Sequence, residues 1–147
     1  MSRVNWRGVT VDRRTRDMLN EVARRTPNIP YLTPVQGSYN TSVGASAGTH
    51  AGGGAVDITC RNLTAGQANE TVRIMRLVGF AAWRRLASEG PWSEHIHALA
   101  VGQSDLSAAA ARQVDALRRG RNGLANNGPD RHHGLGLPVI TWEQYLG

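Results

Sequence analysis

The chain reads His50-Ala51-Gly52-Gly53-Gly54-Ala55-Val56-Asp57 near its centre, and this stretch indicates more about the fold than any other. Three consecutive glycines disfavour a helix, because glycine costs about 1 kcal/mol relative to alanine in a helix interior. The apolar run that follows, Ala55–Thr59, predicts a short buried strand. We therefore expect His50 on a loop or strand end, a turn through the glycines, and Asp57 on the strand.

A second polar stretch, Glu94-His95-Ile96-His97, opens another strand-like segment further along the chain. Alternate residues of a strand point to the same side, so His95 and His97 are expected to share one face. Glu94 has the opposite parity and faces away in a regular strand, although it reaches the same site if the strand begins after it. Glu94 and His95 are therefore both candidate general bases.

Together the two stretches offer imidazole and carboxylate groups, which are the usual ligands of a catalytic zinc ion. A sheet that brings them together would leave one coordination position open for water, the reagent of a hydrolase. Within the second stretch, one histidine could bind the metal while the other stands beside that water. Small residues after His50 suit such a site, because ligand atoms around one ion lie about 3 Å apart.

The rest of the chain predicts helices around this sheet. Thr64-Ala65-Gly66-Gln67 is a capping-box pattern that opens a helix, and Gly79 is expected to end it. The other expected elements are a helix from Thr10 to Thr26 capped by Thr10, strand-like pieces at Tyr31-Leu32 and Val35, strands at Phe80–Leu86 and His95–Val101, a helix from Ser104 or Ser107 through Leu117, and a closing segment at Val139–Leu146. We predict a single α+β domain over residues 1–147, with a small antiparallel sheet flanked by helices.

Composition limits the class of protein. A hydrophobic content of 40% and a charged content of 19% are typical of a soluble globular domain. The longest apolar runs, such as Val78–Trp83, are far too short to span a membrane, and we expect no membrane partner. The segment Met1–Trp6 lacks the apolar core of a signal peptide. The single cysteine, Cys60, excludes an internal disulfide and a multi-thiolate zinc site, and we expect it to be a packed core thiol.

The net charge of +6 favours a polyanionic partner, either nucleic acid or an anionic bacterial cell wall. Only 5% of the residues are aromatic, and no dense basic cluster alternates with aromatic residues. Nucleic acid is therefore the less favoured partner.

The pattern His50-x-x-Gly53-x-Ala55-x-Asp57, followed by Glu94-x-x-His97, resembles the Hedgehog/D-Ala-D-Ala peptidase family, which includes phage peptidoglycan endopeptidases. The resemblance implies a fold of that type and one Zn²⁺ bound by His50, Asp57 and His97. It assigns the general base to Glu94, whereas related enzymes with a His-x-His pattern use the first histidine, here His95. Strand parity favours His95.

The chain departs from the family pattern upstream of the first ligand. The family usually has an arginine there that contacts the substrate, whereas this chain reads Gln36-Gly37-Ser38-Tyr39-Asn40. Gln36 or Tyr39 could donate a hydrogen bond to the substrate instead, although a neutral donor binds an oxyanion more weakly than a guanidinium.

The resemblance implies a monomeric, zinc-dependent peptidase that hydrolyses peptidoglycan stem peptides as an endopeptidase or a DD-carboxypeptidase. Without a signal peptide, such an enzyme would be of the phage lysis type, made in the cytoplasm and released by a holin or carried on a virion. Two alternatives are a non-catalytic, zinc-stabilised wall-binding or virion structural protein, and a metal-dependent nuclease that uses His132 and His133 with Asn126 or Asn127.

Overall fold

The computed structural model describes residues 2–147 and has an α+β architecture with two antiparallel sheets. The strands are β1 (Arg3–Trp6), β2 (Val9–Asp12), β3 (Pro34–Gln36), β4 (Ala55–Thr59), β5 (Phe80–Arg85) and β6 (His95–Ala100). The helices are α1 (Arg13–Arg24), α2 (Ala65–Val78), α3 (Ala108–Arg118) and α4 (Trp142–Leu146), with short 3₁₀ turns η1 (Gly44–Ser46), η2 (Ala87–Glu89) and η3 (His133–Leu135).

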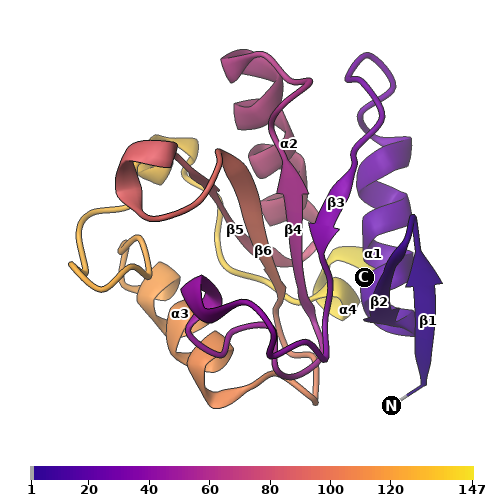
Figure 1. Cartoon of the computed structure of the whole chain (residues 1–147). Helices are drawn as coiled ribbons and strands as arrows, with labels where there is room; N and C mark the ends of the chain where they lie inside the picture. Colours follow the sequence, from indigo (N-terminus) through magenta and orange to yellow (C-terminus); the bar gives the residue numbers. More distant parts are fainter. Residues whose placement is uncertain (1) are drawn as a thin grey trace.

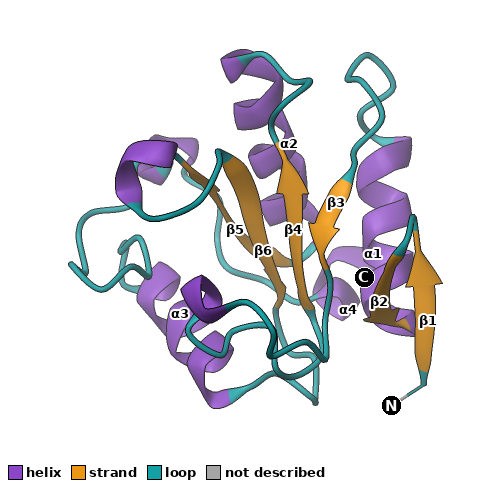
Figure 2. Cartoon of the chain, viewed as in Figure 1, coloured by secondary structure: helices purple, strands orange, loops and turns teal. Residues whose placement is uncertain are grey.

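The central sheet has the strand order β3-β4-β6-β5, and every neighbouring pair is antiparallel. Strands β1 and β2 form a separate hairpin beside α1 (Figures 1 and 2). The prediction of a small antiparallel sheet flanked by helices is confirmed.

Alternation along the strands gives the central sheet two different faces. On β4, Val56 and Ile58 belong to the larger core cluster, which includes apolar residues of α1 and α2. Ala55 points to the other face and packs in a smaller cluster with Trp83 and residues of α3. Asp57 shares the parity of Ala55, so its side chain points to the face of the sheet that packs against α3.

The N-terminal segment corrects one prediction. The helix expected from Thr10 begins at Arg13, and its N-cap is Asp12, whose side chain accepts a hydrogen bond from Thr15 N–H. The preceding residues form the hairpin instead, through a turn in which Arg7 and Gly8 both have positive φ angles of 51° and 96°. Such a turn matches the twist of the two strands it joins.

The other elements follow the sequence more closely. Thr64 forms the expected capping box at the start of α2, and Gly79 ends this helix with a left-handed φ of 118°. Ser107, one of two candidates, caps α3. Tyr31 and Leu32 lie outside the strands, and β3 occupies Pro34–Gln36 at the edge of the sheet, where a proline is tolerated.

One further expectation about the interior holds. Cys60 is buried in the larger core cluster, and burial raises the pKa of its thiol to about 12. Trp6 and Trp83 are buried, while Trp142 is half-buried against the core. Among residues 2–147, no helix has the length and apolar character needed to cross a bilayer.

Candidate metal centre

Two of the predicted metal ligands lie directly opposite each other on paired strands. Asp57 of β4 and His97 of β6 are register partners, and His97 Nδ1 lies 2.9 Å from Asp57 Oδ1. His50 approaches from the loop before β4, and its Nε2 lies 3.2 Å from the same carboxylate oxygen. All three side chains are buried, and their candidate ligand atoms lie within 4.8 Å of one another. The structure thus brings the three predicted ligands together.

The glycines after His50 hold its loop in place. Gly52 packs so closely on the turn after β6 that an added Cβ would lie 1.9 Å from Asp105 O. Gly54 has a φ of 81°, and its N–H donates to Asp12 Oδ1. The small size of these glycines therefore allows close contact with the neighbouring backbone, and this contact positions His50 indirectly. It is not needed to bring the candidate ligands close to one another.

Hydrogen bonds at the outer nitrogens orient both histidines. His50 Nδ1 lies 2.7 Å from Gly37 O, a group that can only accept. His97 Nε2 lies 2.7 Å from Gln113 Oε1, and Gln113 Nε2 donates to Gly123 O, which fixes the orientation of the amide. The outer nitrogens therefore carry the protons, and a neutral ring turns its inner lone pair toward Asp57.

The electrostatics of this cluster favour a cation. Burial lowers the pKa of His97 and keeps its ring neutral. The inner nitrogens and the carboxylate are then acceptors that face one another, and His50 Nε2 finds no hydrogen-bond partner within the described chain.

The donor set and two of its three separations are compatible with a metal ion. In tetrahedral zinc sites, ligand atoms at 2.0–2.2 Å from the metal lie roughly 3.3 Å apart. The observed separations of 3.2 and 2.9 Å are close to that value. A buried group of two imidazoles and one carboxylate can therefore hold a metal ion and leave a fourth position open.

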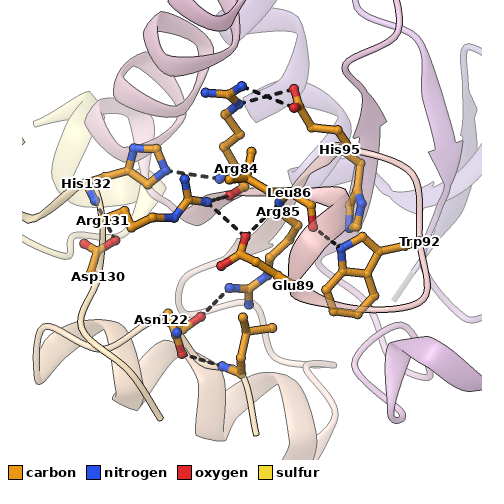
Figure 3. Close-up of polar contacts among 12 residues, drawn as sticks. Arg84, Arg85, Leu86, Glu89, Trp92, His95, Asn122, Asp130, Arg131 and His132 are labelled. Carbon is orange, nitrogen blue, oxygen red and sulfur yellow. Dashed lines mark hydrogen bonds and ion pairs between the residues drawn. The ribbon is translucent and has the colours of Figure 1, made fainter. Parts of the chain in front are cut away.

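His95 stands beside this group on the same face of β6. Its Nδ1 lies 2.9 Å from Ser93 O, so Nδ1 carries the proton and Nε2 presents a lone pair. Nε2 lies 3.9 Å from Asp57 Oδ2, and the ring contacts the Trp92 indole edge-on, with 5.7 Å between centroids. Figure 3 shows His95 next to Trp92, whose indole N–H donates to Leu86 O.

Glu94 lies on the opposite face of the sheet. Its carboxylate forms an ion pair with Arg84 at 3.2 Å, and it borders a separate cavity together with Cys60. Of the two candidate bases, only His95 lines the cavity that contains the metal ligands.

That cavity has a volume of about 490 Å³ and contains one of the two predicted substrate-binding residues. Gln36 lines it: Gln36 Oε1 accepts from Ser46 Oγ, whereas Nε2 is buried with no hydrogen-bond partner among residues 2–147. Tyr39 does not line it, because its hydroxyl donates to Asp105 Oδ2 at 2.8 Å. Burial and Asp105 raise the pKa of Tyr39 to about 12.

Residues that the sequence did not single out complete the cavity. Gln113 of α3 and Arg85 of β5 both line it. No spacing rule marks Gln113, since it is a long polar residue of a type common on exposed surfaces. Strand parity could have found Arg85, because Arg85 pairs with His95 across β5 and β6.

His132 and His133 lie in another cavity, which they share with Arg76 and Asp130. His132 Nε2 accepts a hydrogen bond from the Arg84 backbone N–H, and burial followed by the charge of Arg76 lowers its pKa to about 4. The histidine pair of the nuclease alternative is therefore separate from the metal ligands.

Comparisons with family models, with curated proteins and with solved structures found no significant match to this chain. Any assignment of function therefore depends on the geometry of the site and on the sequence resemblance.

Proposed function

We propose that this chain is a zinc-dependent peptidase that hydrolyses stem-peptide bonds of peptidoglycan, as an endopeptidase or a DD-carboxypeptidase. One observation carries the proposal. Two inner imidazole nitrogens and a buried carboxylate converge at the wall of a cavity, with the free nitrogen of His95 beside them. The same ligand order underlies the resemblance to the Hedgehog/D-Ala-D-Ala peptidase family, and we propose a fold of that type.

The chemistry of the ligands favours zinc over the harder divalent cations. His50 and His97 offer nitrogen atoms, whereas Ca²⁺ and Mg²⁺ prefer oxygen ligands. One bound ion would supply Lewis acidity and acidify water for attack on a peptide carbonyl.

Side chains of the protein would accept the proton from the attacking water and bind the substrate. His95 accepts a proton at Nε2, and the Ser93 carbonyl keeps Nδ1–H in place, so the ring becomes a cation held near Asp57. Its edge contact with Trp92 restricts rotation of the imidazole. Gln36 Nε2, which is buried and unpartnered in the described chain, is available to donate to the substrate carbonyl oxygen.

The surroundings suit a peptide from an anionic wall. The cavity joins polar groups to apolar lining residues such as Val43, Trp92 and Leu124, as peptide-binding clefts do. A net charge of +6 favours approach to a wall that carries phosphate and carboxylate groups. We propose that this chain is a phage-type lysis enzyme, which is released by a holin or carried on a virion.

The decisive experiment is digestion of purified sacculi by zinc-loaded protein, with mass analysis of the released muropeptides. We expect release of new amino termini or of free D-alanine, which stops when a chelator is added. His50→Ala should lose both the metal and the release, because it removes one ligand from the centre. A protein that holds one zinc per chain yet releases nothing would contradict the proposal and favour a non-catalytic wall-binding role.

A further inference from the structure

Arg85 places a guanidinium group in the wall of the same cavity. It ends β5, and its register partner is His95 of β6, so both side chains lie on the face that carries the metal ligands. Its neighbour Arg84 points to the opposite face. Figure 3 shows the two side chains leaving the strand in opposite directions, Arg84 upward and Arg85 down toward Asn122.

The surroundings of Arg85 leave its charge without a counterion. The residue is only 3% exposed. Its Nη1 donates to Asn122 O, and the guanidinium lies 4.7 Å from the centre of the Trp83 ring. Its Nη2 is buried with no hydrogen-bond partner, and Arg85 forms no ion pair within residues 2–147.

The nearby carboxylates are already engaged. Glu89 lines the cavity, but it pairs with Arg131 at 3.0 Å and accepts a hydrogen bond from Leu86 N–H. Asp57 faces the two histidines. Burial lowers the pKa of Arg85 to about 10, so the side chain is still a cation at neutral pH.

A buried cation without a counterion is costly, and an anion in the cavity would lower that cost. The free nitrogen lies beside Gly123, a residue of the cavity lining. A Cβ added at Gly123, which lines the cavity, would be 3.4 Å from Arg85 Nη2. Charge-assisted hydrogen bonds between guanidinium and carboxylate groups are among the stronger polar contacts in proteins.

We propose that Arg85 binds a carboxylate of the peptide substrate and thereby fixes the direction in which the peptide lies. This inference rests on the proposed peptidase function. The strand order β3-β4-β6-β5 puts Gln36 and Arg85 on opposite sides of the metal ligands. The peptide would therefore cross the strands, with a carbonyl toward Gln36 and its carboxylate over β5.

Two carboxylates of a stem peptide could fill this position: the C-terminal one, or the α-carboxylate of a γ-linked glutamate within the chain. Three synthetic peptides distinguish them. The first is acetyl-L-Ala-γ-D-Glu-L-Lys-D-Ala-D-Ala with both carboxylates free. The other two carry an amide at either the C-terminus or the glutamate α-carboxylate.

The test measures binding of each peptide to the metal-free, folded protein by calorimetry, so that a metal ion cannot itself bind the carboxylate. We expect one of the two amides to bind about 10- to 100-fold more weakly than the free acid, in keeping with the loss of one charge-assisted hydrogen bond. Arg85→Gln should abolish this difference. Arg84→Gln, the control on the other face, should keep it.

Equal binding of the acid and both amides to the unsubstituted protein would overturn the proposal, as would no binding of the acid at millimolar concentration. This comparison needs no variant, so it holds even where Arg85→Gln fails to fold. In that case Arg85→Lys, which keeps the positive charge, should retain part of the preference for the acid. Full discrimination in a folded Arg85→Gln protein would also overturn the role of Arg85. Arg85-dependent binding without any hydrolysis by the zinc-loaded protein would instead overturn the peptidase function alone.

Discussion

At the scale of single residues, Gln113 orients His97 in the candidate metal centre. Its Oε1 accepts from His97 Nε2, and this contact directs His97 Nδ1 toward Asp57. We expect Gln113→Leu to weaken zinc affinity about 10- to 100-fold, the usual effect of removing such a support. Competition with a chromophoric chelator measures it.

Gln113→Glu is the matched control, because it keeps an acceptor oxygen for His97 Nε2–H. It should bind zinc at least as tightly as the unsubstituted protein. Equal loss of affinity in both variants would mean that the contact of Gln113 with Gly123 O, rather than with His97, holds the centre together.

His95 and Glu94 differ in a way that activity measurements can separate. His95→Ala should keep one zinc per chain and slow turnover by about 10²- to 10⁴-fold, the usual contribution of a positioned base. Glu94→Gln should change turnover little, because Glu94 pairs with Arg84 on the other face. A large loss of turnover in Glu94→Gln, with His95→Ala fully active, would reverse the assignment.

The sequence predicts which residues meet in the candidate metal centre, because their types and spacing are restrictive. His50, Asp57 and His97 meet as expected, and strand parity alone favours His95 over Glu94. The sequence could not show in the same way whether the Tyr39 hydroxyl lies in the cavity. Its hydroxyl is directed by Asp105, 66 positions away in the sequence, and no local pattern reveals such a contact.

At the scale of secondary-structure elements, Asp12 connects helix α1 to the loop that carries His50. Its carboxylate caps α1 at Thr15 and also accepts from the Gly54 backbone N–H just before β4. We expect Asp12→Ala to lower the free energy of unfolding by about 2–4 kcal/mol, since it removes a cap and leaves a buried N–H unpaired. Urea denaturation measures the change.

Asp12→Asn is the corresponding control. Its side-chain oxygen can still cap α1, so the loss should be smaller than in Asp12→Ala. A loss below about 1 kcal/mol in Asp12→Ala would show that water replaces the carboxylate at both helix and loop.

The secondary-structure elements differ in how well the sequence predicts them, because some depend on local patterns and others on distant pairing. The Thr64 capping box is local, so the start of α2 can be identified within four residues. The hairpin of β1 and β2 is short, and Val11 fits both the alternation of a strand and the apolar stripe of a helix with Met18. Pairing with β1 decides between strand and helix at Val11. The spacing of apolar residues along the sequence does not reveal which segments pair with each other.

At the scale of the whole molecule, buried polar groups join the C-terminal segment to the sheet and to α2. Arg76 forms a paired contact with Asp130 at 2.8 and 3.0 Å, and its Nε donates to Ala82 O. His132 adds a contact to the Arg84 backbone. These bonds involve residues far apart in the chain, so they hold only in the complete fold.

His132 therefore makes stability depend on pH. Burial, followed by the charge of Arg76, lowers its pKa from the ordinary 6.5 to about 4, so the unfolded chain binds a proton more readily than the folded one. This contribution is present above pH 6.5 and declines as the pH falls toward 4. We expect the urea midpoint of the metal-free protein to fall over this interval.

His132→Gln tests the assignment, since a glutamine does not titrate. The difference in midpoint between the two proteins should change between pH 6.5 and 4 and stay constant above pH 7. A constant difference throughout would mean that other histidines produce the pH dependence.

The origins of the three metal ligands have one more consequence, which concerns timing. Asp57 and His97 sit on adjacent strands that are paired over five positions and packed on both faces, so the sheet can form before any ion arrives. His50 belongs to a loop outside the sheet that is held by its own backbone contacts, and binding of an ion would stabilise that loop further. If zinc binds as proposed, a newly made chain could complete its core and accumulate as a latent form. Metal supply, rather than folding, would then determine when that store becomes active.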